Sequence, residues 1–359
     1  MSACRTRKAC AVRRGWSGGQ PDWQRGEAVK IGLITSGGDS PGMNPCIAEL
    51  VKWSRASGHT AVGIQGGYPG VLQRAYLPLD ACDIQPIYKR GGSVLKSGRL
   101  PELHDGAVAV RLVQTLREDG FQCVFVLGGD GSFRGAQALA HAAKGEIAFF
   151  GLPATIDNDV WGTRYTLGFD TAINKLAQYI DDIMDTAVTM PGRVFLIETL
   201  GRDGRLAYSA EQMGLVDFSV TLERDLSDDM VCERVRWLLT HGRDYVLITY
   251  SEGTAGRMFG AARQLEKELG CSVKCNMIGY QQRGGCPTAA ERMFAAGFAK
   301  EAWRALMSGA RSGYIVWDDG RFSLAPLADA NKKKPFVPEP GTYDLSSVEN
   351  TTCREDFLC

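Results

Sequence analysis

The stretch FQCVFVLGGDGS, residues 121–132, joins a short run of apolar and aromatic residues to a glycine-rich turn. A helix-like pattern follows it through Ala142, so we predict a strand, a turn and a helix in that order. Two other stretches have the same layout: VKIGLIT (29–35) stops at SGGDSPG, and RVFLIETL (193–200) stops at GRDG. Buried strands that alternate with helices are typical of parallel sheets covered on both faces. The sequence therefore predicts a three-layer α/β architecture with mostly parallel sheets.

A second series of elements follows the first. Residues 170–190 have the clearest helical pattern, with Ile173, Leu176 and Ile180 on one face. The run DYVLITY (244–250) then begins another set of strands. This second strand series indicates that the chain has two halves.

The chain is expected to divide into four segments. Residues 1–28 hold six basic groups and predict a flexible basic leader. The first lobe covers residues 29–165 and the second covers residues 166–334. The boundary between them is approximate, and the chain can cross back from the second lobe to the first. Residues 335–359 carry prolines and an excess of acids, and they predict an acidic, poorly ordered tail.

Composition limits the classes of function. The chain has 359 residues, and its 41 Lys and Arg balance its 41 Asp and Glu, so no global charge attracts nucleic acid or an anionic membrane. Its apolar runs are far shorter than the roughly 18 residues that span a bilayer. The 11 scattered cysteines fit reduced thiols in a cytosol. We expect a cytoplasmic protein whose partners are small molecules, with neither nucleic acid nor a membrane among them.

Carboxylates gather at two of the predicted strand ends. GLPATIDND (151–159) places Asp157 and Asp159 directly after an apolar strand, and Asp130 belongs to the GGDGS turn. Because ligands of open α/β sheets bind at the carboxyl ends of the strands, we expect these side chains in one crevice. One carboxylate can hold Mg²⁺ on a nucleotide while another accepts a proton from an attacking hydroxyl, as in phosphoryl transfer. The alternative is that these polar residues only cap a turn.

Glycines and arginines recur at the same strand ends. Free amides in a glycine turn before a helix favour phosphate oxygens, and three such turns suggest a polyphosphate. Guanidinium groups offer paired donors to phosphate, and four stand beside these turns: Arg99, Arg193, Arg202 and Arg283. Each feature alone also has an ordinary explanation, as a tight turn or a solvated surface residue.

Taken together, these residues resemble the 6-phosphofructokinases of the bacterial type. The matching stretches stand in the family order over about residues 29–338: TSGGDSPGMN (35–44), GGSVLKSGR (91–99), GGDGS (128–132), LPATIDND (152–159), ETLGR (198–202), SEG (251–253) and QRGGCP (282–287). TIDND after GGDGS is highly specific to this family. The resemblance implies two similar α/β lobes, an active site in the cleft between them, and a homotetramer.

The resemblance also implies roles for residues at matching positions. The first lobe would bind the nucleotide, with its phosphates held by Gly38, Arg99, Gly128, Gly129, Asp130, Gly131 and Ser132, and with Asp130 near Mg²⁺. Asp157 would be the general base for the sugar 1-hydroxyl, assisted by Thr155, Asp159 and Arg202. The second lobe would bind the sugar phosphate through Leu200, Gly201, Arg202 and Glu252, and the 6-phosphate through Arg193, Lys274, Tyr280 and Arg283. The implied activity is that of an ATP-dependent 6-phosphofructokinase.

The phosphate donor is expected to be ATP. Family members that use pyrophosphate have Asp at the position of Gly131 and Lys at the position of Ala154, where these side chains compete for the space of the α-phosphate. Gly131 and Ala154 leave that space open. Near the adenine, Leu100 and His104 replace residues that are Phe and Arg in the bacterial enzymes, so the resemblance does not specify the base.

Two departures leave the acceptor open. Lys274 stands where the family has a phosphate-binding Arg, and Tyr280 stands where the bacterial enzymes have His. Lys keeps the charge but loses the paired donors of Arg. The acceptor is therefore fructose 6-phosphate or, alternatively, another phosphorylated ketose such as sedoheptulose 7-phosphate. A pyrophosphate-dependent transferase and a catalytically silent regulatory subunit are further alternatives.

A third departure concerns regulation. Ala48 and Ala81 replace two arginines that bind the allosteric nucleotide in bacterial members, although Lys52 and Asp217 keep one charge of each sign. We expect weak regulation or none at that site.

Overall fold

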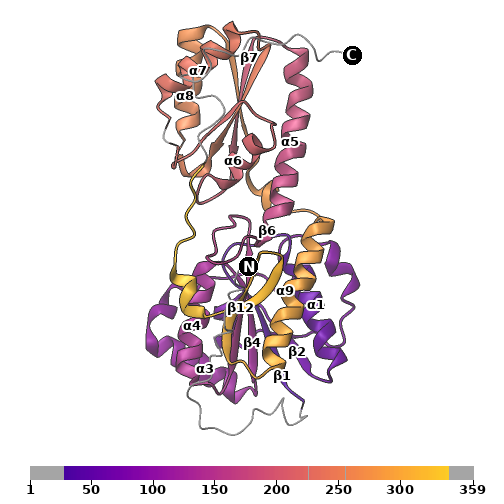
Figure 1. Ribbon diagram of the computed structural model, residues 1–359. Coiled ribbons are helices and arrows are strands. Elements are labelled where there is room, and N and C mark those ends of the chain that lie inside the picture. The colour runs from indigo at the N-terminus through magenta and orange to yellow at the C-terminus, as the bar shows by residue number, and fades with distance from the viewer. Residues whose placement is uncertain (1–27, 225, 255, 339–359) are drawn as a thin grey trace, which may run out of the picture.

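The chain folds into two α/β lobes stacked along the long axis of the molecule (Figure 1). The computed structural model describes residues 28–338, except residues 225 and 255. Nearly all of the predicted basic leader and of the predicted acidic tail lies outside these residues.

The large lobe contains an eight-stranded sheet in the order β12-β11-β5-β4-β1-β2-β3, with β6 paired to β5. Its strands are β1 (Lys30–Thr35), β2 (Thr60–Ile64), β3 (Tyr76–Pro78), β4 (Cys123–Gly128), β5 (Ala148–Thr155), β6 (Leu167–Gly168), β11 (Ser312–Asp318) and β12 (Arg321–Ala325). Only the two outermost pairs, β2 with β3 and β11 with β12, are antiparallel. Figure 1 shows the helices α1 (Met43–Ala56) and α9 (Ala289–Met307) to one side of the sheet, and α3 (Gly106–Glu118) and α4 (Asp130–Ala143) to the other.

Both faces of this sheet are buried, as its apolar strands predict. Successive side chains of a strand point to opposite faces, and Phe125 accordingly packs in the core with α1 and α9, whereas Val124 and Val126 pack in the core with α3 and α4. The short elements around this lobe are α2 (Tyr68–Leu72), η2 (Gln85–Lys89), η3 (Pro101–His104) and η6 (Leu327–Asn331).

The small lobe contains a four-stranded, fully parallel sheet in the order β10-β7-β9-β8. Its strands are β7 (Arg193–Thr199), β8 (Phe218–Val220), β9 (Tyr245–Ser251) and β10 (Ser272–Met277). The helices α7 (Asp228–Thr240) and α8 (Arg257–Leu269) cover one face, and α5 (Phe169–Thr189) and α6 (Arg205–Gln212) cover the other. Two short 3₁₀ turns, η4 (Glu252–Thr254) and η5 (Gly279–Arg283), follow strands β9 and β10.

The strands that the sequence predicts within residues 29–35, 121–127, 193–200 and 244–250 are confirmed as β1, β4, β7 and β9, and the predicted helix is confirmed as α5. One boundary differs, because α4 already begins at Asp130, inside the GGDGS turn. This places the backbone amides of the turn at the start of a helix.

The expected extent of the second lobe, residues 166–334, is wrong at its C-terminal end. The chain crosses back after η5, and α9, β11 and β12 all join the large lobe. Strand β11 pairs with β5, so residues 312–314 cover a sheet edge that would otherwise expose unpaired backbone groups. The small lobe therefore ends near residue 288.

A buried carboxylate ties the two lobes together where α5 and α9 begin. Glu291 is 0% exposed, and its Oε1 accepts a hydrogen bond of 2.7 Å from the backbone N–H of Gly168. Its Oε2 accepts bonds from the N–H and Oγ1 of Thr171, at 3.2 and 3.1 Å. A Cβ on Gly42 would lie 2.7 Å from Oε1, so this position of the TSGGDSPGMN stretch has no room for a side chain. Burial raises the pKa of Glu291 to about 7, although these hydrogen bonds act in the opposite direction.

Candidate active site

Strand ends from both lobes border one cavity of about 350 Å³. The large lobe contributes the segments that follow β1, β4 and β5, and the small lobe contributes those that follow β7 and β9. Of the predicted residues, Gly38, Arg99, Gly129, Gly131, Ser132, Thr155 and Asp157 line the cavity from the large lobe, and Gly201, Arg202, Glu252 and Arg283 line it from the small lobe. The volume lies within the usual range of small-molecule sites.

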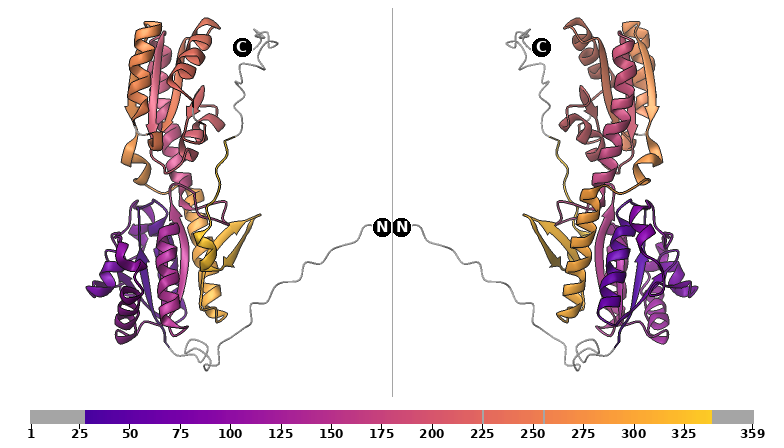
Figure 2. Two further views of the ribbon diagram at one scale, coloured as in Figure 1. Left: turned by 90° about the vertical axis from the view of Figure 1, so that its left-hand side faces the viewer. Right: turned by 90° about the vertical axis from the view of Figure 1, so that its right-hand side faces the viewer.

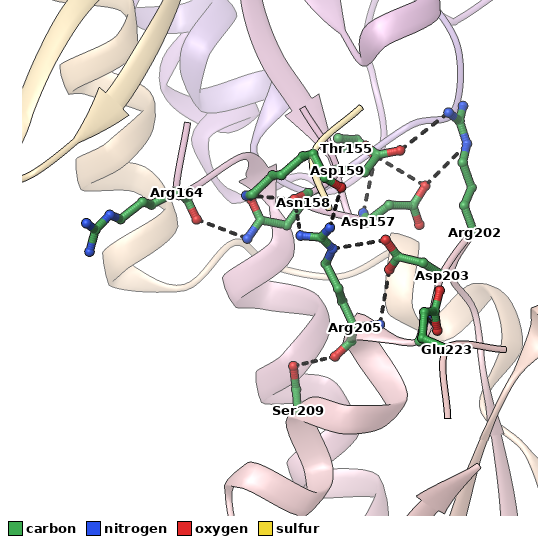
Figure 3. Close-up of polar contacts among 12 residues, drawn as sticks. Thr155, Asp157, Asn158, Asp159, Arg164, Arg202, Asp203, Arg205, Ser209 and Glu223 are labelled. Carbon is green, nitrogen blue, oxygen red and sulfur yellow. Dashed lines mark hydrogen bonds and ion pairs between the residues drawn. The ribbon is translucent and has the colours of Figure 1, made fainter. Parts of the chain in front are cut away.

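Arg202 is the link between the predicted carboxylates. Its Nη1 donates to Asp130 Oδ1 at 2.9 Å and to Asp159 Oδ2 at 3.4 Å. Its Nε lies 3.7 Å from Asp157 Oδ2. Figure 3 shows Arg202 reaching the TIDND loop from the small lobe. A single guanidinium thus gathers three carboxylates that stand at the ends of two different strands.

The charges of these groups affect each other. Burial raises the pKa of Asp159 to about 6, and the neighbouring charge of Asp157 adds to this effect. Burial also acts to raise the pKa of Asp130, but the hydrogen bond and the charge of Arg202 outweigh it, so that pKa is lowered. Asp130 is therefore ionised at neutral pH, as a ligand of a cation must be.

Asp157 is held on a tight turn at the end of β5. Its side chain is nearly buried, with the residue 7% exposed, and it still borders the cavity. The backbone N–H of Asp157 donates to Thr155 Oγ1 at 3.2 Å, and Thr155 Oγ1 donates to Asp157 Oδ2 at 3.4 Å. The next residue, Asn158, is left-handed with φ 51°, a conformation that Asn tolerates better than most residues. A carboxylate fixed in this way can receive a proton from a hydroxyl in the cavity.

Two glycines allow the backbone to approach neighbouring groups closely. A Cβ on Gly38 would lie 2.2 Å from Arg283 Nη1, and that nitrogen donates to the carbonyl of Asp39 at 3.3 Å. A Cβ on Gly128 would lie 2.3 Å from Ser132 Oγ, which donates to the carbonyl of Ser36 at 3.0 Å. The turns after β1 and β4 are packed together, and the start of α4 borders the cavity with backbone amides, groups that favour an anion.

The residues present fit a magnesium ion that arrives with a nucleotide. Asp130 supplies one ionised oxygen ligand at the start of α4. Within residues 28–338, as far as they are described, no group of three or more His, Cys, Asp or Glu encloses a metal. Magnesium on a nucleotide takes most of its ligands from phosphate and water, so a single carboxylate is a suitable protein contribution.

Three of the residues expected to bind the 6-phosphate do not border this cavity within one chain. Arg193 and Lys274 line a different cavity, between α5 and the strands β7 and β10. Tyr280 is 81% exposed. Arg283 alone of this set borders the cavity of Asp157, where it contacts the turn after β1.

Other predicted residues lie just outside the cavity lining. Asp130 and Asp159 each accept a hydrogen bond from Arg202, which borders the cavity. Gly128 packs against Ser132, which also borders it. The backbone N–H of Leu200 donates to Gln282 Oε1 at 2.7 Å, so this bond fixes the turn after β7.

Tyr68 belongs to the site although none of the motifs named above includes it. Tyr68 lines the cavity, and its hydroxyl donates to the carbonyl of Ser132 at 2.6 Å. Its signal was a fourth glycine turn after a short strand, GGYPG at residues 66–70. Leu103 and Gly135 border the same part of the cavity, next to the predicted Leu100.

Asp217 does not present the free carboxylate that an effector site would use. It is 3% exposed, its Oδ1 accepts from Arg243 Nε at 2.9 Å, and its Oδ2 accepts from the N–H of Leu247 at 2.9 Å. Asp217 thus anchors the start of β8 to the neighbouring strand.

The model of the phosphofructokinase family matches residues 30–306, which include every motif around the cavity. The chain belongs to the phosphofructokinase family. This phosphofructokinase is 35% identical to the ATP-dependent 6-phosphofructokinase 1 of Thermus thermophilus, over 86% of this chain and 95% of that protein. It is 31% identical to the ATP-dependent 6-phosphofructokinase of Aquifex aeolicus, over 89% of this chain and 99% of that protein.

Solved phosphofructokinases share the fold. The Saccharomyces cerevisiae structure is 26% identical with a TM-score of 0.77, over 84% of this chain and 45% of that chain. The pyrophosphate-dependent phosphofructokinase of Nitrosospira multiformis has a TM-score of 0.78 at 18% identity, over 87% of both chains. This chain spans less than half of the yeast chain, and the second likeness bears on the fold alone. The predicted two-lobed α/β fold is confirmed.

Within the described part of this phosphofructokinase, no helix has the length and apolar character that crossing a membrane requires.

Proposed function

We propose that this phosphofructokinase transfers the γ-phosphate of ATP to the 1-hydroxyl of fructose 6-phosphate, with Asp157 as the general base. The observation that carries the proposal is the position of Asp157, which borders the interlobe cavity within 3.7 Å of Arg202. Relatives named ATP-dependent 6-phosphofructokinases, 31% and 35% identical over most of the chain, support the same activity. No observation favours another phosphorylated ketose as the acceptor.

In this mechanism the two lobes have different tasks. The large lobe would bind the nucleotide phosphates at the turns after β1 and β4 and at Arg99, with Asp130 as the protein ligand of magnesium. Magnesium would neutralise charge on the transferred phosphate. The small lobe would orient the sugar through Arg202 and Glu252, so that its hydroxyl meets both the base and the γ-phosphate.

Arg202 has a second task in the proposal. Its guanidinium pairs with Asp130, Asp157 and Asp159, and its single positive charge offsets part of their combined negative charge. Asp130 would hold magnesium when the nucleotide is bound, and its carboxylate would then engage Arg202 less. Arg202 would then be able to stabilise the charge that develops on the transferred phosphate.

Space in the cavity supports ATP as the donor. A Cβ on Gly131 would meet nothing closer than Arg134 Nη2 at 3.6 Å, and Ala154 presents only a methyl group to the cavity. The α-phosphate and the nucleoside therefore have room beside the turn. The apolar border formed by Leu100, Leu103 and Tyr68 suits a flat base.

The 6-phosphate site requires more than one chain in this proposal. Arg283 borders the cavity of Asp157, but Arg193 and Lys274 border another. We expect a homotetramer in which Arg193 and Lys274 of one copy complete the site of a neighbouring copy. A location in the cytoplasm, where both substrates occur in glycolysis, belongs to the same proposal.

The test is Asp157→Ser, assayed with ATP or pyrophosphate against a panel of ketose phosphates. We expect kcat with ATP and fructose 6-phosphate to fall by about 10²–10⁴-fold, the usual contribution of a general base, while both KM values change by less than about threefold. Asp318→Ser, a surface carboxylate that pairs with Arg164, is the matched control and should keep full activity. A large rise in KM with kcat preserved would contradict the assignment of the base.

A further inference from the structure

A third connection between the lobes passes behind the TIDND loop. After η6 the chain leaves the large lobe and runs to α6 of the small lobe, and we call residues 332–336 the strap. In Figure 1 it is the yellow segment that rises beside α4, and Figure 2 shows it running apart from α5 and α9. The strap also pairs with the loop through the antiparallel bridge Val160–Lys333.

Lys334 is the residue through which the strap holds the loop. Its Nζ donates to the carbonyl of Thr163 at 2.7 Å, to the carbonyl of Asn158 at 2.9 Å and to Asn158 Oδ1 at 3.2 Å. These three bonds use all the donors of an ammonium group. The carbonyls at the two ends of the loop 158–163 are therefore fixed to one point.

The small lobe holds the strap in turn. Arg205 Nη2 donates to the carbonyl of Lys334 at 2.8 Å, and Arg205 Nη1 donates to the carbonyl of Asn158 at 3.4 Å. Phe336 packs edge-on against Tyr208, with ring centroids 5.7 Å apart, and the Arg205 guanidinium lies 5.2 Å from the Phe336 ring. Figure 3 shows Arg205 rising from α6 to Asn158, on the side of the loop away from Arg202.

The peptide that Lys334 holds lies between the two carboxylates that face Arg202. Asn158 has φ 51°, a left-handed conformation that Asn tolerates better than most residues but that persists only where the surroundings hold it. Asp157 and Asp159 stand on either side of it and turn toward Arg202. A loop that relaxed at Asn158 would move both carboxylates relative to the cavity.

We propose that Lys334 is a positioning residue for phosphoryl transfer, which acts by clamping the Asn158 carbonyl so that the Asp157 carboxylate stays aligned in the cavity. The kinetic part of this proposal rests on the proposed function. Because the strap joins the lobes at the loop that carries the base, it also couples the placement of α6 to the geometry of the site.

The test compares three single variants of the full chain. Lys334→Met removes the donors and the charge but keeps an unbranched side chain, Lys334→Arg keeps both, and Lys333→Met changes the exposed neighbour on the same strap. We expect Lys334→Met to lower kcat by about 10- to 100-fold, the cost of a small misplacement of a reacting group, with KM for both substrates nearly unchanged. Lys334→Arg should recover most of the loss, and Lys333→Met should match the wild type.

Hydrogen exchange provides a readout that does not depend on activity. The backbone amides of residues 157–164 should exchange faster in Lys334→Met than in Lys333→Met, because the loop loses its anchor. If the wild type does not turn over these substrates, the proposed function fails, and the exchange rates still test the clamp.

If Lys334→Met does not fold, Phe336→Ala takes its place, because it removes the contact with Tyr208 that holds the strap. We expect Phe336→Ala also to lower kcat and to speed exchange of the loop amides. Unchanged kcat and unchanged exchange would overturn the proposal. A loss that falls on KM, with kcat preserved, would also overturn it.

Discussion

Glu291 makes the stability of the interlobe junction depend on pH. Its carboxylate is 0% exposed, and burial raises its pKa from 4.5 to about 7. Between these two values the folded chain binds a proton that the unfolded chain releases. The free energy of unfolding therefore falls as pH rises from about 4.5 to about 7, and the stabilisation is fully present only below the lower value.

The size of the effect follows from the shift in pKa. At about 1.4 kcal/mol per unit, a rise from 4.5 to about 7 corresponds to a loss on the order of 3 kcal/mol by pH 8. Glu291→Gln cannot ionise, so its own contribution is independent of pH. The amide still accepts a bond from Gly168, but its NH₂ group faces the N–H of Thr171, which costs about 1–3 kcal/mol at every pH.

Thermal unfolding of both proteins from about pH 5 to about pH 8 measures this dependence. The wild type should lose stability relative to Glu291→Gln as pH rises, and the difference between the two curves should change most steeply about midway between 4.5 and about 7 and level off above about 7. Glu301 lies on the same helix, is partly exposed and pairs with Arg304. Glu301→Gln is therefore the control and should follow the wild type. Parallel curves for the wild type and Glu291→Gln over this range would refute the reasoning.

Two further substitutions test the cavity itself. Gly38→Ala places a methyl group 2.2 Å from the present position of Arg283 Nη1, so we expect that side chain to be displaced and kcat/KM for fructose 6-phosphate to fall by about tenfold or more in steady-state assays. Gly106→Ala, where a Cβ would meet nothing within 4 Å, should leave the kinetics unchanged. Ala154→Lys fills the space beside the turn after β4, so activity with ATP should drop by about 10²-fold or more, whereas activity with pyrophosphate should drop much less. An equal loss with both donors would contradict the assignment of this space to the α-phosphate.

Local patterns in the sequence were enough to predict the elements and the motif residues of the site. Apolar runs predict four of the strands, and helical spacing predicts one helix: β1, β4, β7, β9 and α5. Both patterns depend only on residues that are close together in the sequence. The glycine turns and TIDND placed Asp130 and Asp157 at strand ends for the same reason. A strand, a glycine turn or a helix of this kind forms from residues that are near each other in the sequence, so distant parts of the chain are not needed to predict it.

The tertiary structure alone decided which of these pieces meet. The return of β11 to pair with β5, the guanidinium of Arg202 among three carboxylates, and the placement of Arg193 and Lys274 away from Asp157 all depend on contacts far apart in the sequence. Lys334 is the clearest case, since its partner Asn158 lies 176 residues earlier in the chain. Local spacing carries no information about such a partner, because the packing of the two lobes against one another selects it.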